Sequence, residues 1–94
     1  MYYVYLIQND STFEIYIGYT TDPILRLKQH NNGGKKFTSR LSGKWKYVYM
    51  ELYRSKQDAL SREKQLKRHA GGKNQLLKRL TYSLLEPKIG EGRS

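Results

Sequence analysis

Two tyrosine-rich apolar runs near the N-terminus constrain the fold of this chain more than any other feature of its sequence. Residues 2–8 and 13–19 are rich in Tyr, Val, Ile and Phe, which favour strands. The polar stretch Asn-Asp-Ser-Thr at residues 9–12 separates them, and residues of these types favour turns. The pattern therefore predicts a β-hairpin.

Alternation within the two runs predicts how their side chains divide between the faces of the hairpin. If the turn is centred in the polar stretch, between residues 10 and 11, Tyr5 lies opposite Tyr16 and Tyr3 lies opposite Gly18 on one face. The other face is aliphatic and carries Val4, Leu6, Ile15 and Ile17. A register change of two residues would keep this division, whereas a slip of one would turn a strand over.

Helix and strand signals continue along the chain. Asp22 as N-cap and Pro23 at the first helical position predict a helix of about ten residues, which Gly33-Gly34 should stop. Alternation over residues 44–53 predicts a third strand, with one face formed by Trp45, Tyr47 and Tyr49.

The second half of the chain predicts two further helices. Ser55 and Asp58 form a capping signal for a helix over residues 56–70, which Gly71-Gly72 should end. A last helix is expected from about Asn74 to Leu85, with its leucines at helical spacing.

The element order ββαβαα predicts an α+β domain in which helices flank a small three-stranded antiparallel sheet, a β-hairpin plus a third strand. We expect residues 1–85 to form this single domain and residues 86–94 to be a disordered tail. The absence of Cys excludes disulfides and Cys-based metal sites or nucleophiles. Since the sequence has neither a signal-peptide pattern nor an apolar run of about 20 residues, we expect a cytoplasmic protein without a membrane partner.

Charge is distributed unevenly along the chain. Eighteen Lys and Arg stand against eight Asp and Glu, a formal net charge of +10. The whole excess lies after residue 34, because the preceding part holds fewer cationic than anionic side chains. Such a surface favours a polyanion as partner, since each phosphate that it neutralises releases condensed counterions. The alternative is a well-solvated basic surface that binds no nucleic acid.

Glu63 interrupts the apolar stripe of the helix predicted over residues 56–70. The stripe consists of Ala59, Leu60, Leu66 and Ala70, and the stem of Lys67 lies at its margin. A carboxylate withdrawn from water needs a cation or hydrogen bonds to compensate it. Two explanations stay open: an ion pair with Arg26, Arg40 or another nearby cation, and service as the single carboxylate ligand of a Mg²⁺ ion that keeps several waters.

Arg26 and His30 are four residues apart in the first predicted helix, so they project from the same side. A lone helical His is more often a surface or core residue than a catalyst, and tyrosine clusters usually pack a sheet. From composition and spacing alone, the sequence indicates a basic nucleic-acid-binding domain with one helical acid that needs a partner.

Two short motifs, Tyr-Val-Tyr at residues 3–5 and Tyr-Ile-Gly at residues 16–18, resemble those of the GIY-YIG nuclease superfamily. The motif residues are Tyr3, Val4, Tyr5, Tyr16, Ile17 and Gly18. The resemblance covers roughly residues 2–80 and is closest to small single-domain bacterial members. It continues, in the order typical of the family, through Arg26, His30, Thr38, Glu63 and Asn74.

The resemblance implies a GIY-YIG-like fold and a metal-dependent endonuclease that hydrolyses phosphodiester bonds. Tyr16 would receive a proton from the attacking water, and Tyr5 would orient that water or Tyr16 by hydrogen bonding. Arg26 would face the charge that develops on phosphorus, and His30 would relay a proton or steady the phosphate. Glu63 would hold one Mg²⁺ or Mn²⁺ ion, which supplies Lewis-acid catalysis.

Phosphate contacts are expected from the cationic part of the chain, and the residues singled out are Lys35, Lys36, Thr38, Arg40, Lys67 and Asn74. We expect DNA in preference to RNA and little intrinsic sequence specificity, because no appended domain is present to read base edges. A protein partner could supply specificity. The competing functions are a catalytically weak or inactive nucleic-acid-binding module, and an adaptor whose cationic surface meets an acidic protein.

Overall fold

The computed structural model describes residues 1–32, 43–68 and 70–85. Three antiparallel strands form one sheet in the order β2-β1-β3, with bounds β1 (Tyr2–Asn9), β2 (Ile15–Thr20) and β3 (Trp45–Tyr53). Helix α1 (Pro23–Asn31) follows β2, and helices α3 (Lys56–Arg68) and α4 (Ala70–Arg79) follow β3. The predicted α+β class and the order ββαβαα are confirmed.

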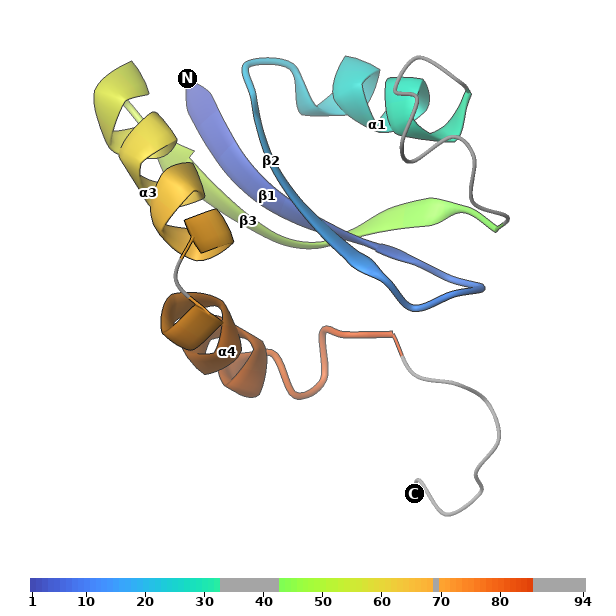
Figure 1. Cartoon of the computed structure of the whole chain (residues 1–94). Coiled ribbons are helices and arrows are strands. Elements are labelled where there is room, and N and C mark those ends of the chain that lie inside the picture. Colours follow the sequence, from blue (N-terminus) through green and yellow to red (C-terminus); the bar gives the residue numbers. More distant parts are fainter. Residues whose placement is uncertain (33–42, 69, 86–94) are drawn as a thin grey trace.

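Helices cover both faces of the sheet (Figure 1). Helix α1 packs over the aromatic face, whose buried residues are Tyr5, Ile7 and Trp45. Helices α3 and α4 lie on the other side, where α3 contacts all three strands. Within the described residues, no helix is both long and apolar enough to cross a bilayer.

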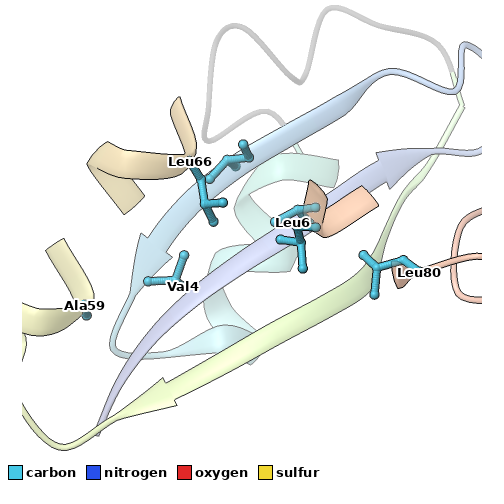
Figure 2. Close-up of a cluster of buried hydrophobic side chains, with 7 residues drawn as sticks. Val4, Leu6, Ala59, Leu66 and Leu80 are labelled. Carbon is cyan, nitrogen blue, oxygen red and sulfur yellow. The ribbon is translucent and has the colours of Figure 1, made fainter. Parts of the chain in front are cut away.

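The larger apolar core lies between the sheet and helices α3 and α4 (Figure 2). Its buried members are Val4, Leu6, Ile17, Ala59, Leu66, Leu76 and Leu80. The aliphatic face predicted for the hairpin thus meets the apolar residues of two helices. This packing fixes which side of α3 faces the sheet, and therefore where the polar residues of α3 can project.

The register of the hairpin differs by two residues from the predicted one. Tyr5 lies opposite Gly18 rather than Tyr16, and Tyr3 lies opposite Thr20. Because the difference is two and not one, the division of the faces is unchanged, and Tyr5 and Tyr16 still share the aromatic face.

The turn between β1 and β2 explains this register. The side-chain oxygen Oδ1 of Asn9 accepts hydrogen bonds from the backbone N–H groups of Ser11 (2.8 Å) and Thr12 (3.0 Å). Phe13 adopts a left-handed conformation with φ of 63°. The turn is therefore centred one residue later than predicted, and each strand pairs two residues further along.

Strand β3 does not alternate as regularly as predicted. Trp45 and Tyr47 lie on the aromatic face, but the register with β1 shifts in the middle of the strand. Tyr49 consequently packs against the core on the opposite face, and Met50 joins the aromatic face. The irregularity moves one predicted aromatic residue from one face to the other.

The predicted N-terminal caps are present. Asp22 Oδ1 accepts a hydrogen bond from the N–H of Leu25 (3.1 Å), and Ser55 Oγ accepts one from the N–H of Asp58 (3.3 Å). The expected stop of the first helix, at residues 33–34, lies outside the described residues.

The predicted start of the helix at residue 56 is confirmed, but its predicted end and both predicted boundaries of the last helix are wrong. Helix α3 ends at Arg68, and α4 begins at Ala70, includes both glycines and ends at Arg79. Glycine costs only about 1 kcal/mol in a helix, which burial of leucines such as Leu76 offsets. The chain then turns and the N–H of Leu85 donates to the side chain of Gln8 (2.7 Å), which is incompatible with a helix continuing to residue 85. The predicted tail, residues 86–94, lies outside the described residues.

Candidate active site

Tyr5 lies at the centre of the sheet, and its side chain is completely buried. Its partner on β2 makes room for it, because a Cβ atom on Gly18 would overlap the Tyr5 ring and hydroxyl. A hydrogen bond of 2.8 Å joins the Tyr5 hydroxyl and Nε2 of His30. Burial raises the pKa of Tyr5 well above its usual range, although the nearby Arg26 guanidinium acts in the opposite direction. Tyr5 therefore stays protonated at neutral pH.

We expect Gly18→Ala to destabilise the fold by about 1–3 kcal/mol, the usual cost of overpacking, because the added methyl group would displace the Tyr5 ring. Gly71→Ala is the matched control, since an added Cβ there meets none of the described residues within 4 Å and Ala favours helix. Thermal unfolding measures both effects. A Gly18→Ala variant that melts with the parent would contradict the close approach of Gly18 and Tyr5.

His30 connects the two motif tyrosines, which are not opposite each other in the sheet. Its side chain is 1% exposed and packs edge-on against Tyr5 and Tyr16, with ring centroids 5.9 Å and 5.1 Å apart respectively. The imidazole therefore bridges the two phenols from α1. The sequence predicted that Arg26 and His30 share one side of this helix, but not that His30 touches both tyrosines.

Arg26 lies one helical turn earlier on α1 and approaches the same cluster. Its Nη1 atom donates a hydrogen bond to the backbone oxygen of Tyr19 (3.1 Å), which ties the guanidinium to β2. Burial raises the pKa of Tyr47 to about 12, and the charge of Arg26 opposes this shift, as it does for Tyr5. The positive charge of Arg26 is thus placed beside one buried phenol, Tyr5, and one partly buried phenol, Tyr47.

Glu63 lies on the side of α3 where the sequence placed it, with buried Ala59 and Leu66 one turn away on either side. Its side chain is 19% exposed, and the Nζ atom of Lys67 approaches the carboxylate to 3.0 Å. Arg26 bonds to the backbone of β2 instead, and the other named candidate, at residue 40, lies outside the described residues. An ion pair with a nearby cation is therefore present, and metal binding by Glu63 stays a prediction.

Lys67 connects α3 to the aromatic face of the sheet. Strand β2 is an edge strand, so a long side chain of α3 can reach around it. The Nζ atom of Lys67 lies 5.7 Å from the centroid of the Tyr16 ring, within cation–π range. A continuous series of contacts therefore joins Tyr5, His30, Tyr16, Lys67 and Glu63.

The carboxylate of Glu63 is a suitable ligand for one hard divalent cation. A depression of about 500 Å³ is lined by Leu60, Glu63, Lys64, Lys67 and Arg68. The described residues contain no group of three or more His, Cys, Asp or Glu that could enclose a metal. A single carboxylate fits Mg²⁺ or Mn²⁺, which keep waters and take substrate phosphate as further ligands. Since Glu63 already pairs with a cation, its carboxylate is accessible to positive charge.

Glu51 is a second partly buried carboxylate, which the sequence analysis did not identify. It accepts hydrogen bonds from the hydroxyls of Tyr49 (2.7 Å) and Tyr53 (2.6 Å). The guanidinium of Arg62 donates to both of its oxygens. Burial alone would raise the pKa of Glu51, but these hydrogen bonds outweigh it and lower the pKa. With its oxygens engaged by protein donors, Glu51 ties β3 to α3 and is no candidate metal ligand.

The other residues singled out in the sequence have different surroundings. Val4 and Ile17 of the motifs belong to the core under α3, and Tyr3 is partly buried on β1. Asn74 is exposed on α4 and takes no part in the series of contacts from Tyr5 to Glu63. Four expected phosphate contacts lie outside the described residues: Lys35, Lys36, Thr38 and Arg40.

Known proteins are similar to this chain in sequence and in fold. The family model for the GIY-YIG catalytic domain matches residues 1–76. A UPF0213 protein of Clostridium perfringens is 41% identical over 69 residues, 72% of each chain. Another from Haloquadratum walsbyi is 38% identical over 77 residues, 81% of this chain and 84% of that one. The solution NMR structure of a UPF0213 protein from Bacillus halodurans has a TM-score of 0.53 and 31% identity, covering 85% of both chains. Because the family model covers most of the chain and the C. perfringens relative is 41% identical over 72% of it, the chain belongs to the GIY-YIG family of nuclease domains.

Proposed function

We propose that this protein is a metal-dependent endonuclease that hydrolyses phosphodiester bonds in nucleic acid, DNA in preference to RNA, with little intrinsic sequence specificity. The observation that carries the proposal is the continuous series of contacts from Tyr5 to Glu63, which brings two phenols, an imidazole, an ammonium and a carboxylate together from four elements. Packing of a small α+β fold does not by itself require that combination of groups.

The two phenols have different parts in the proposed reaction. Tyr5 is buried and protonated, and its hydrogen bond to His30 positions the imidazole against Tyr16. Tyr16 lines a depression of about 280 Å³ together with Lys67 and Lys73, so its side chain is accessible from solution. Tyr16 is therefore the phenol that, once its own proton has passed to the neighbouring His30, receives the proton of the attacking water.

Arg26 and Glu63 supply the electrostatic part of the reaction. Arg26 stabilises the negative charge that develops on the phosphate, as a guanidinium fixed by a backbone carbonyl can do without reorganisation. Glu63 holds one divalent cation, which when bound supplies Lewis-acid catalysis and stabilises the leaving group.

Cationic side chains of α3 and α4 form the expected path for the phosphate backbone. Lys64, Lys67 and Arg68 line the depression beside Glu63, and Lys73 lines the one beside Tyr16. Contacts of Lys and Arg to phosphates position a strand without reading its bases. Low sequence specificity follows from this kind of contact.

Nucleic-acid binding should depend steeply on salt. If six phosphates are contacted, the logarithm of the affinity for duplex DNA falls against the logarithm of salt concentration with a slope of about −5. Lys73→Gln should reduce the magnitude of this slope by about 0.9, whereas Lys46→Gln on β3, which pairs with Asp10, is the matched control and should not. Fluorescence anisotropy over a salt series measures the slope. A salt-insensitive affinity would count against a polyanion partner.

The function is tested by incubating the protein with branched, nicked, single-stranded and duplex DNA, and with the corresponding RNA, in Mg²⁺, Mn²⁺ or EDTA. We expect cleavage with either metal and none in EDTA, while binding persists in EDTA. Binding without cleavage of any substrate would instead identify a nucleic-acid-binding module. If the protein neither binds nor cleaves any of these substrates, nucleic acid is excluded as the partner and an acidic protein is favoured.

A further inference from the structure

The ammonium group of Lys67 pairs with the Glu63 carboxylate, which is the proposed ligand of the divalent cation. Its Nζ atom is 3.0 Å from the Glu63 carboxylate and 5.7 Å from the centroid of the Tyr16 ring. The side chain also lines both the depression beside Glu63 and the one beside Tyr16. Among the residues that the structure describes, no other cation forms an ion pair with Glu63.

The ion pair is weak enough to be exchanged. Lys67 and Glu63 are four residues apart on one helix, and their side chains are 46% and 19% exposed. A solvated i,i+4 pair of this kind changes an equilibrium by only about twofold. A divalent cation carries twice the charge of an ammonium, and the two cations repel each other when they share one carboxylate. Binding of metal to Glu63 therefore favours departure of the ammonium.

We propose that Lys67 is an exchangeable counterion of the active site. In the metal-free protein its ammonium neutralises Glu63, and when Glu63 exchanges it for a divalent cation, Lys67 turns to a phosphate of the strand bound beside Tyr16. The inference rests on the proposed metal site at Glu63. The exchange couples binding of the divalent cation to binding of nucleic acid, because the Lys67 ammonium that the metal displaces becomes a contact for a phosphate.

The first test is Mn²⁺ binding in the absence of nucleic acid, measured by electron paramagnetic resonance of free Mn²⁺. Lys67→Met should bind Mn²⁺ about two- to fivefold more tightly than the parent, because competition at Glu63 is removed. Lys64→Met is the matched control: it removes the same charge from the same depression without breaking the ion pair. Lys67→Arg, which keeps the charge, should bind Mn²⁺ like the parent.

The second test asks when Lys67 contacts the nucleic acid. DNA binding is measured in a Tyr16→Phe background, which keeps the aromatic ring under Lys67, with Mn²⁺ or with EDTA. In Mn²⁺, adding Lys67→Met should reduce the magnitude of the slope of log affinity against log salt concentration by about 0.9, which corresponds to the loss of one phosphate contact. In EDTA the slope should not change. An equal reduction in both conditions would overturn the exchange.

The outcomes separate this inference from the proposed function. If Mn²⁺ binding depends on Glu63 but Lys67→Met binds no more tightly than Lys64→Met, the exchange is wrong and the metal site stands. If the parent and Glu63→Gln bind Mn²⁺ equally, the metal site at Glu63 is wrong and the exchange falls with it. Thermal unfolding of every variant confirms that the folded proteins are being compared.

Discussion

Replacing Tyr16 by Phe should slow cleavage by about 10²–10⁴-fold, the range typical of a lost general base, without unfolding the protein. Only a hydroxyl is removed. The ring that remains can keep its edge contact with His30 and its position under Lys67, so the surrounding packing should not change. Single-turnover cleavage in Mg²⁺ separates this chemical effect from substrate binding, which should stay near that of the parent.

Tyr19→Phe is the matched control for this experiment. Tyr19 lies on the same strand but belongs to the opposite face, where its ring stacks on Tyr2 with centroids 6.4 Å apart. Loss of its hydroxyl should leave cleavage unchanged. If Tyr16→Phe cuts as fast as Tyr19→Phe, Tyr16 is a packing residue and another group accepts the proton.

The sequence predicted the faces of the hairpin but not its register, and the reason is physical. Alternation fixes which side chains share a face, because successive residues of a strand point to opposite sides. The register was set by the side chain of Asn9, which caps two backbone N–H groups of the turn, and by the left-handed conformation of Phe13. Neither feature follows from hydrophobic periodicity. The pairing of Tyr5 with Gly18 consequently appeared only in the structure.

Helix boundaries show the same limit. Caps at Asp22 and Ser55 are local hydrogen bonds and were predicted, whereas the passage of α4 through Gly71 and Gly72 depends on burial of leucines against distant strands. Tertiary packing overrides the low helix propensity of glycine there. A local pattern cannot weigh that contribution.

Part of the candidate site was predicted because a charged residue, Glu63, occupies a position where the helical spacing calls for an apolar side chain. Glu63 stood in an apolar stripe, and both the need for a cation and the possibility of a metal followed from that position. Its partner, Lys67, was recognisable in principle, since i,i+4 pairs of Glu and Lys are favourable on helices. The reach of Lys67 around β2 to Tyr16 was not, because it depends on β2 being an edge strand.

Glu63→Gln should abolish metal-dependent cleavage while changing the stability of the metal-free protein by no more than about 0.5 kcal/mol. The small effect on stability follows from the ion pair itself: Lys67 is 46% exposed, so water can solvate its ammonium when the carboxylate is lost. Gln also preserves the size and the helix propensity of Glu. Nucleic-acid binding in EDTA should persist, because the cationic side chains of α3 and α4 are unchanged.

Glu51→Gln provides the contrast, since the Glu51 carboxylate accepts the hydrogen bonds from Arg62 that join β3 to α3. Arg62, whose side chain is 24% exposed, would lose its charged partner, and the expected cost is about 1–3 kcal/mol. In a domain of this size, 1 kcal/mol lowers the melting temperature by roughly 4–8 °C. The two substitutions should therefore affect different properties: Glu51→Gln mainly lowers stability, and Glu63→Gln mainly removes catalysis.

Thermal unfolding with and without Mg²⁺ decides the role of Glu63. A ligand that binds only the folded state raises the melting temperature by mass action, so Mg²⁺ should stabilise the parent and leave Glu63→Gln unaffected. Cleavage is measured on the same samples, so that loss of activity can be separated from loss of folded protein. A Glu63→Gln variant that is strongly destabilised, and whose remaining folded fraction still cuts, would overturn the metal assignment. Glu63 would then be a structural ion-pair residue, and the divalent cation would have to bind elsewhere.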